Sequence, residues 1–170
     1  MPTRIIILGK PNVGKSSLFN IFLKKNIAIV DDFSGLTRDV RKKKIKLWDK
    51  ECILFDTPGI INNSSKDLDK KIKNITFDNA KLADLIVLVF DGKSELSSLD
   101  YDIVQIVRKL NKKTMLVINK AEGRTNESVK EKLETQGFGK PILVSASHNQ
   151  NIDQLRWIIY ESINMNNDDI

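Results

Sequence analysis

A glycine-rich segment near the start of the chain has the spacing of a phosphate-binding loop. Two glycines separated by four residues precede Lys15 and Ser16, and the segment directly follows the apolar run 4–8. Such a loop points successive backbone N–H groups at a β-phosphate, and the helix that follows adds its dipole. Lys15 supplies positive charge to the β- and γ-phosphates, and the Ser16 hydroxyl is placed to bind Mg²⁺. The sequence therefore predicts a nucleotide site that includes Gly9, Lys10, Pro11, Asn12, Val13, Gly14, Lys15, Ser16 and Ser17.

Three shorter motifs follow in chain order, each after an expected strand. Asp-Thr-Pro-Gly at 56–59 places Asp56 to hold Mg²⁺ through water, while the Gly59 N–H faces the γ-phosphate. Asn-Lys-Ala-Glu at 119–122 and Ser-Ala-Ser at 145–147 come at the carboxyl ends of strands, where open α/β sheets bind ligands. The residues of these motifs predicted to contact the nucleotide are Asp56, Thr57, Pro58, Gly59, Ile60, Asn119, Lys120, Ala121, Glu122, Ser145 and Ala146.

The last two motifs carry the chemistry of guanine recognition. The Glu122 carboxylate can accept from the ring N–H and from the exocyclic amine of guanine. The Lys120 stem can cover the face of the base, and the Ala146 N–H can donate to the carbonyl oxygen. Adenine lacks that carbonyl and presents a donor in its place, so a site of this kind should reject adenine.

Apolar runs and helical patterns alternate along the chain, which predicts a doubly wound α/β fold. The sheet is expected to be mostly parallel, with an antiparallel edge hairpin that turns across 49–51. Strands are expected near 4–8, 41–48, 51–56, 84–91, 114–118 and 141–145, and helices near 15–24, 68–81, 99–110, 126–136 and 151–163.

Composition fits one domain of ordinary size. The chain has 170 residues, of which 41% are hydrophobic and 29% charged. Its apolar stretches are strand-length, whereas a membrane helix needs about 20 apolar residues, and no secretory signal precedes the first strand. Cys52 is the single cysteine and is expected to pack in a strand, which favours a reducing, cytoplasmic compartment. His148 has no partner at metal spacing and is expected in a surface loop.

The net charge of +6 is notable because many of the basic residues are clustered. Such clusters suit contact with a polyanion, but a lysine-rich chain also produces them as solvated faces, and both interpretations stay open. No aromatic residue is interleaved with them for base stacking, so contact with an RNA backbone is favoured over reading of bases. The clusters are Arg41, Lys42, Lys43, Lys44 and Lys46; Lys66, Lys70, Lys71 and Lys73; and Lys109, Lys112 and Lys113.

At residues 3–163 the chain resembles the translation-factor-like GTPases of the group that contains Era, MnmE and Der. The similarity rests on the amino-acid sequences of the segments 9–16, 35–39 and 56–60, and it is greatest to the first GTPase domain of Der. It implies a P-loop NTPase G domain over 1–163, with 164–170 as a linker or disordered end of a longer protein. A second GTPase domain and a small RNA-binding domain would follow.

The resemblance also implies an activity and roles for particular residues. The chain would be a GTP-binding switch that hydrolyses GTP to GDP and phosphate and acts in ribosome assembly, on the large subunit. Its partners would be a ribosomal subunit or rRNA, reached through the basic patches. Thr37 would close onto Mg²⁺ when GTP is bound. The metal ligands would be Ser16, Thr37 and Asp56, and the catalytic residues Asn12, Lys15, Thr37 and Gly59.

Two positions qualify the expected chemistry. Ile60 stands where Ras-like enzymes place a glutamine that orients the attacking water. The resemblance implies instead a potassium ion, held partly by Asn12, that offsets charge in the transition state. A structural role for Asn12 in its loop is the alternative. Glu122 replaces the aspartate usual in the guanine motif of these enzymes, so we expect guanine preference to be retained but modestly loosened.

Other functions stay open at this point. The domain could be a GTP-regulated binding module with negligible hydrolysis, or an Era- or MnmE-like domain in RNA processing or tRNA modification. An iron-transporter G domain would need a membrane segment further along the chain. An ATP-using kinase would have no use for the motifs at 119–122 and 145–147.

Overall fold

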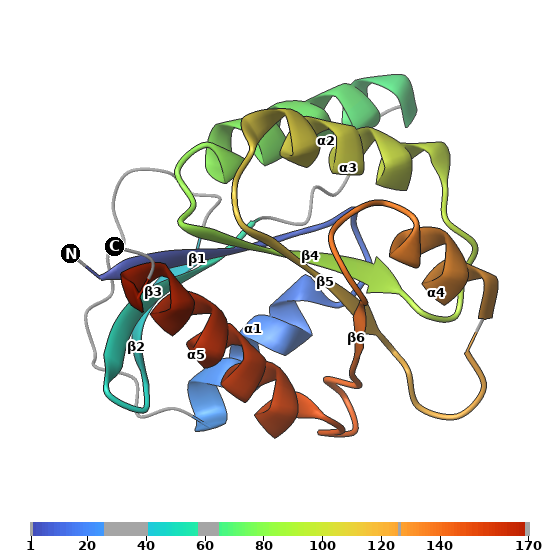
Figure 1. Cartoon of the computed structure of the whole chain (residues 1–170). Coiled ribbons are helices and arrows are strands. Elements are labelled where there is room, and N and C mark those ends of the chain that lie inside the picture. Colours follow the sequence, from blue (N-terminus) through green and yellow to red (C-terminus); the bar gives the residue numbers. More distant parts are fainter. Residues whose placement is uncertain (1, 26–40, 58–64, 126, 169–170) are drawn as a thin grey trace.

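A computed structural model of the chain describes residues 2–25, 41–57, 65–125 and 127–168 (Figure 1). Its elements follow the expected alternation. They are β1 (Thr3–Leu8), α1 (Lys15–Lys25), β2 (Arg41–Leu47), β3 (Lys50–Asp56), α2 (Ser65–Ala80), β4 (Leu85–Asp91), α3 (Ser98–Leu110), β5 (Thr114–Asn119), α4 (Glu127–Glu134), β6 (Ile142–Leu143) and α5 (Ile152–Asp168).

The strands form one sheet in the order β2-β3-β1-β4-β5-β6. The pair β2–β3 is antiparallel, and every other pair is parallel. This confirms the predicted doubly wound fold and its edge hairpin. Because the parallel strands run the same way, the loops that follow β1, β3, β4, β5 and β6 all leave the same edge of the sheet.

Alternate residues of the central strands enter two separate cores. On β1, Ile5 and Ile7 pack with α1 and α5, whereas Ile6 and Leu8 pack with α2, α3 and α4. Figure 1 shows this division, with α1 and α5 on one face of the sheet and α2 and α3 on the other. A strand that is apolar at every position is therefore buried on both faces, as a parallel sheet between helices requires.

The edge hairpin forms as predicted, but its turn lies at Trp48 and Asp49 rather than across 49–51, because Lys50 and Glu51 already pair as residues of β3. Arg41 pairs with Asp56 at one end and Leu47 with Lys50 at the other, and Trp48 turns the chain with a positive φ of 52°. Cys52 is buried in β3 as a packing residue, and its burial raises the pKa of the thiol to about 12.

The expected end of the last helix, at 163, is wrong. Helix α5 continues to Asp168, across most of the segment expected to be a linker or a fraying end. Ile163 is still buried, and no glycine or proline follows it to stop the helix, so weak helix formers extend α5 after its apolar face has ended. Whether 164–170 acts as a linker stays a prediction. In the described ranges, no helix is both long and apolar enough to cross a membrane.

Candidate phosphate and guanine site

The phosphate loop lies between β1 and α1 and needs both of its glycines. Gly9 has a φ of 156°, and a Cβ there would lie 2.6 Å from the Val89 carbonyl oxygen. Gly14 has a φ of 95°, and a Cβ there would lie 2.2 Å from the Asn119 side-chain nitrogen. The loop is therefore pressed against the ends of β4 and β5, and a side chain at either glycine would push it away.

Lys15 is held across the mouth of this loop. Its ammonium donates to the carbonyl oxygens of Gly9, at 2.8 Å, and Lys10, at 2.9 Å. The side chain is buried, and this burial lowers the pKa of Lys15 to about 8, an effect that the charge of Asp56 partly offsets. The loop thus holds a desolvated cation that an anionic ligand would stabilise.

Ser16 and Asp56 meet as predicted for a magnesium site. The Ser16 hydroxyl donates to Asp56 Oδ2 at 3.0 Å. Asp56 is only 3% exposed, and its Oδ1 is buried with no hydrogen-bond partner in the described residues. A hydroxyl and an unsatisfied carboxylate oxygen are hard oxygen ligands of the kind that Mg²⁺ takes beside phosphate oxygens, so these residues fit the ion. Thr37, the third predicted metal ligand, lies outside the described residues.

The rest of the 56–60 motif is described only at its start. The Thr57 hydroxyl donates to the carbonyl oxygen of Ile7 at 3.1 Å and is buried. This side chain therefore fastens β3 to β1, and Thr57 can contact a nucleotide through its backbone alone. Pro58, Gly59 and Ile60 lie outside the described residues, so their predicted roles stay predictions.

Asn119 joins the three loops on the guanine side. Its Nδ2 donates to the Val13 carbonyl oxygen at 3.0 Å, and its Oδ1 accepts the Ala146 N–H at 3.0 Å. The Ala121 N–H donates to the Val144 carbonyl oxygen at 2.9 Å. The Ala146 N–H, predicted to serve the guanine carbonyl, thus already has an acceptor, which a bound base would have to share.

Lys120 spans the gap between the base side and the phosphate loop. It has a positive φ of 61°, and its ammonium donates to the Asn12 carbonyl oxygen at 2.7 Å and to Asp91 Oδ2 at 3.2 Å. The side chain is therefore laid out between the two loops, which is the placement that the predicted covering of a base requires.

Glu122 carries an acceptor that its own loop does not satisfy. A hydrogen bond from Ser145, together with its own backbone N–H, lowers the pKa of the Glu122 carboxyl, so the group is ionised at neutral pH. Its Oε2 is buried and has no partner in the described residues. His148 is exposed, as expected, but its Nδ1 lies 3.8 Å from Glu122 Oε1. A buried, ionised acceptor without a donor is what the N–H groups of guanine would satisfy.

Residues 4–120 match the model of a family described as 50S ribosome-binding GTPases. The chain belongs to this family of GTPases. The match covers the phosphate loop, the 56–59 motif and the first two residues of the 119–122 motif, all of which the structure or the sequence places at one edge of the sheet.

Relatives with curated names agree with this assignment. GTPase Der of Thermotoga sp. strain RQ2 is 42% identical over 153 residues, which are 89% of this chain and 35% of that protein. GTPase Der of Campylobacter fetus subsp. fetus is 42% identical over 162 residues, 94% of this chain and 34% of that protein. These matches confirm the resemblance stated above. The chain spans about a third of the length of these relatives.

A solved structure confirms the fold. Era in complex with MgGDPNP and nucleotides 1506-1542 of 16S ribosomal RNA aligns with a TM-score of 0.74 and 27% identity. The alignment covers 94% of this chain and 56% of that chain.

The candidate site also depends on side-chain contacts that the sequence did not predict. Lys93, after β4, donates to the carbonyl oxygens of Glu122 and Arg124, the latter at 2.8 Å, and so clamps the loop that carries Glu122. Lys10 donates to Asp100 Oδ2 at 2.8 Å, within the capping box of α3. The Lys10 ammonium is thus engaged away from the phosphates, which leaves its backbone for the nucleotide. The Ser-x-x-Asp pattern at 97–100 was a signal for that cap, whereas no local pattern marks Lys93.

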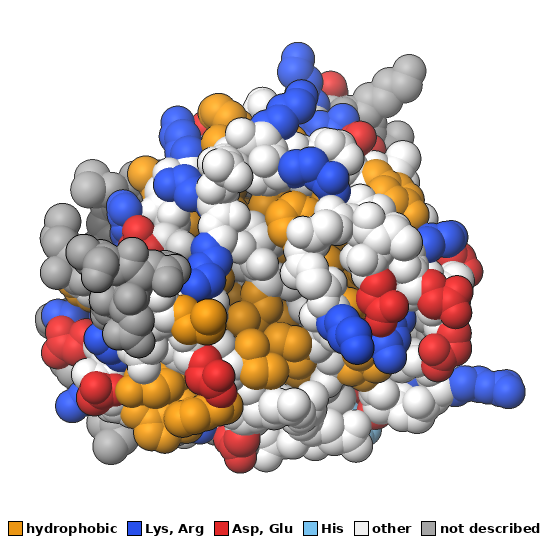
Figure 2. Space-filling model, in the orientation of Figure 1, with side chains coloured by type: hydrophobic (Ala, Val, Ile, Leu, Met, Phe, Trp, Pro, Cys, Tyr) orange, Lys and Arg blue, Asp and Glu red, His pale blue; other side chains and the backbone are white. Residues whose placement is uncertain are grey.

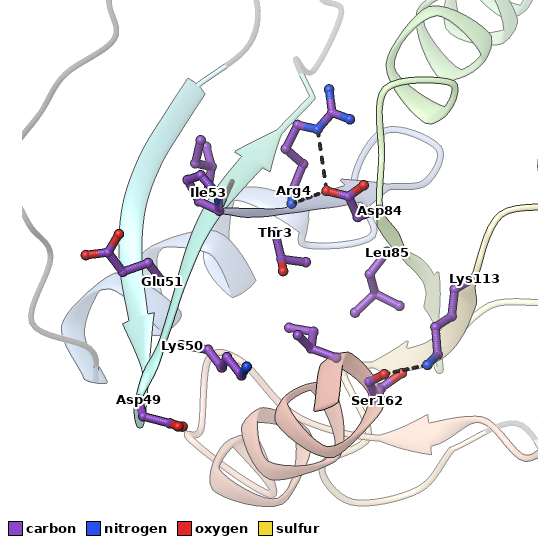
Figure 3. Close-up of a pocket in the computed structure, with 12 residues that line it drawn as sticks. Thr3, Arg4, Asp49, Lys50, Glu51, Ile53, Asp84, Leu85, Lys113 and Ser162 are labelled. Carbon is purple, nitrogen blue, oxygen red and sulfur yellow. Dashed lines mark hydrogen bonds and ion pairs between the residues drawn. The ribbon is translucent and has the colours of Figure 1, made fainter. Parts of the chain in front are cut away.

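A larger hollow lies elsewhere and is unrelated to these residues. A cavity of about 690 Å³ opens at the other edge of the sheet, near the first residues of β1, β3 and β4 (Figure 3). Arg4 pairs there with Asp84, and Lys113 donates to the Ser162 carbonyl oxygen. None of the predicted site residues lines this cavity, so a search for the site by cavity volume alone would select the end of the sheet opposite to the phosphate loop.

The pKa of Lys15 predicts proton uptake on nucleotide binding. With this pKa near 8, part of the Lys15 population is neutral above about pH 7, and a diphosphate beside it favours the charged form. GDP binding should therefore take up a fraction of a proton that grows between about pH 7 and pH 9. Calorimetry in two buffers of different ionisation enthalpy measures it. Lys15→Arg, which stays charged throughout, is the control and should show no such growth.

The clamp formed by Lys93 predicts a loss of guanine affinity. Lys93→Met should weaken binding of a fluorescent GDP analogue by about threefold to tenfold, because the carbonyl oxygens of Glu122 and Arg124 lose their common donor. Lys109→Met, which removes an exposed lysine of α3, is the matched control and should leave the affinity unchanged. Equal affinities in the two variants would contradict the clamp.

Proposed function

We propose that this chain binds GTP and GDP with Mg²⁺ and hydrolyses GTP as a molecular switch. The observation that carries the proposal is the junction at Asn119, which joins the phosphate loop to the loop that carries Ala146. A phosphate cradle and a guanine-type acceptor set are thereby held in one site at one edge of the sheet. Membership of a GTPase family supports the same reaction.

On the phosphate side, Lys15 and the loop N–H groups would hold the phosphates, and Ser16 with Asp56 would hold Mg²⁺. The bound ion would offset negative charge on the β- and γ-phosphates. Thr37 would complete its ligands, and the Gly59 N–H would face the γ-phosphate, as the resemblance implies.

On the base side, the Glu122 carboxylate would accept from the guanine N–H groups, and Lys120 would cover the base. The loop that carries Glu122 is already fixed by Lys93 and by the Ala121 N–H. Glutamate is one methylene longer than aspartate, so its contacts with guanine are expected to be looser. We propose that GTP is preferred over ATP, and competition of each with bound GDP analogue measures this preference.

We propose that a potassium ion offsets charge in the transition state of hydrolysis, in place of a catalytic side chain, and that Asn12 is one of its ligands. Asn12 has a φ of 70° and its side chain is exposed. Its carbonyl oxygen accepts from Lys120, while its side-chain amide makes no hydrogen bond within the described residues. The amide is therefore free to contact an ion or a phosphate, which supports a functional role over a purely structural one.

The deciding experiment is GTP turnover with Mg²⁺ in KCl and in NaCl at equal ionic strength. We expect faster turnover in KCl. Asn12→Gly keeps the left-handed backbone accessible and removes the amide, so it should lose the potassium acceleration while still binding GDP. Asn74→Ala, on the exposed side of α2, is the control. Equal, measurable rates in both salts would exclude the potassium mechanism. No turnover in either salt would favour the GTP-regulated binding module.

We also propose that the switch acts in ribosome assembly, on the large subunit, in the cytoplasm. The family description, the curated relatives named GTPase Der and the RNA-bound Era neighbour support a ribosomal partner. The curated relatives favour a Der-like role over an Era- or MnmE-like one. The relatives are about three times as long, so further domains would contribute to that contact.

The basic clusters support this partner unequally. Lys73 pairs with Asp102 at 3.0 Å and Lys113 donates to a backbone carbonyl, so both have structural roles. Figure 2 shows lysine and arginine side chains scattered over the face viewed rather than gathered in one patch. The run of basic residues on the edge strand β2 is the more concentrated candidate, and we propose it as the surface that faces RNA backbone.

A further inference from the structure

Arg41 occupies a built position against the carboxylate that is proposed to hold Mg²⁺. It begins β2 directly opposite Asp56, the last residue of β3, so the two side chains leave the hairpin on the same face. The Arg41 guanidinium lies over the buried ring of Phe19, 4.7 Å from its centroid, and Nη2 donates to Asp56 Oδ2 at 3.0 Å. Contacts with two elements, α1 and β3, thus fix the cation.

The charge of Asp56 explains why a cation is needed there. A carboxylate that is 3% exposed is costly unless it is paired. Ser16 offers a neutral donor to Oδ2, and the Lys15 ammonium is already shared between two carbonyl oxygens. Arg41 is therefore the cation that contacts the carboxylate directly, while Oδ1 keeps no partner in the described residues.

We propose that Arg41 is a positioning residue that compensates Asp56 when no metal is bound and that Mg²⁺ must displace or repel. This inference rests on the proposed magnesium site. Arg41 and Mg²⁺ would both draw on one carboxylate, and two cations beside it repel each other. The side chain of Arg41 is 52% exposed, so it can swing into water when the ion arrives.

The consequence is a coupling between metal occupancy and the start of β2. Arg41 immediately follows the segment 26–40, which carries the predicted switch residue Thr37. Mg²⁺ binding would remove the ion pair between Arg41, the first residue of β2, and Asp56, the last residue of β3. Only the backbone pairing of the two strands would then join these two residues. Mg²⁺ and Arg41 would therefore compete for the Asp56 carboxylate. Each would lower the affinity of the other for that carboxylate by the same factor.

The test is the magnesium dependence of nucleotide release from the whole chain. The release rate of a fluorescent GDP analogue is measured over a range of free Mg²⁺, and the midpoint of the slowing is compared between variants. Arg41→Gln removes the competitor, so its midpoint should fall to a Mg²⁺ concentration roughly threefold to tenfold lower than in the unchanged chain.

Lys42→Gln is the matched control for loss of positive charge. Lys42 is the next residue of β2, and its ammonium lies over the Phe55 ring rather than on Asp56. Its midpoint should stay within about twofold of the unchanged chain, because bulk charge at this strand is screened by solvent. An equal shift in both variants would assign the effect to general charge and overturn the role of Arg41.

A second readout separates this role from ordinary packing. Thermal unfolding in EDTA should show Arg41→Gln less stable than the unchanged chain, and saturating Mg²⁺ with GDP should narrow that difference. Arg41→Met keeps an apolar stem over Phe19 should the Gln variant fold poorly, and the same midpoint shift is expected.

An unchanged or higher midpoint in the Arg41 variants overturns the inference about Arg41 alone. If Mg²⁺ does not slow release from the unchanged chain, the proposed metal site fails as well.

Discussion

The buried amide of Asn119 is the contact on which the geometry of the site depends. Both ends of its side chain are used, one by the phosphate loop and one by the Ser-Ala-Ser segment, so the amide cannot turn over without losing both hydrogen bonds. Gly14 packs directly against its nitrogen, where any Cβ would collide. A single polar group, satisfied in a dry position, therefore fixes the distance between the place for phosphates and the place for a base.

The doubly wound sheet is what allows one side chain to do this. Parallel strands with helices on both faces bring the ends of β1, β4, β5 and β6 to one edge, where Val13 and Asn119 meet although they are 106 residues apart in sequence. The cores on the two faces are built from the alternate residues of β1 and β4, and they hold the strand ends in register. The topology of the sheet thus brings these loops together, and the polar contacts of Asn119 set the spacing between them.

Sequence reasoning reached the motifs because their spacing encodes local chemistry. The phosphate loop and the edge hairpin are each defined by neighbouring residues, and their local pattern fixes the backbone. The end of α5 was missed because an asparagine-rich run has no strong stop signal and tolerates continuation of a helix that is already anchored by Ile163. Propensity is a weak guide where tertiary packing has set the preceding turns.

The contacts of Arg41, Lys93 and Lys10 were missed for a different reason. Arg41 reads as one member of a basic run, and Lys93 as an isolated lysine after a strand. Their partners, Asp56 and the carbonyl oxygens at 122 and 124, lie on other elements. Pairing of this kind depends on strand register and loop approach, which composition and periodicity do not contain. Lys10 was predicted only as a member of the phosphate loop, and the contact of its ammonium with Asp100 in the cap of α3 joins residues 90 positions apart.

The two halves of the site are stabilised by different physics, and this bears on where a switch can operate. Backbone carbonyls and N–H groups accept or donate most of the contacts that hold the base side, through Asn119, the Ala121 N–H and the Lys93 ammonium. The phosphate side is held by charges that compensate one another, with a desolvated Lys15, an almost fully buried Asp56 and Arg41 beside it. Phosphates and a divalent ion that bind here would change every charge interaction on the phosphate side and few of the contacts on the base side. We therefore expect the base side to serve as the fixed frame, and the proposed nucleotide-dependent change to begin at the charged side, where β2 begins and β3 ends.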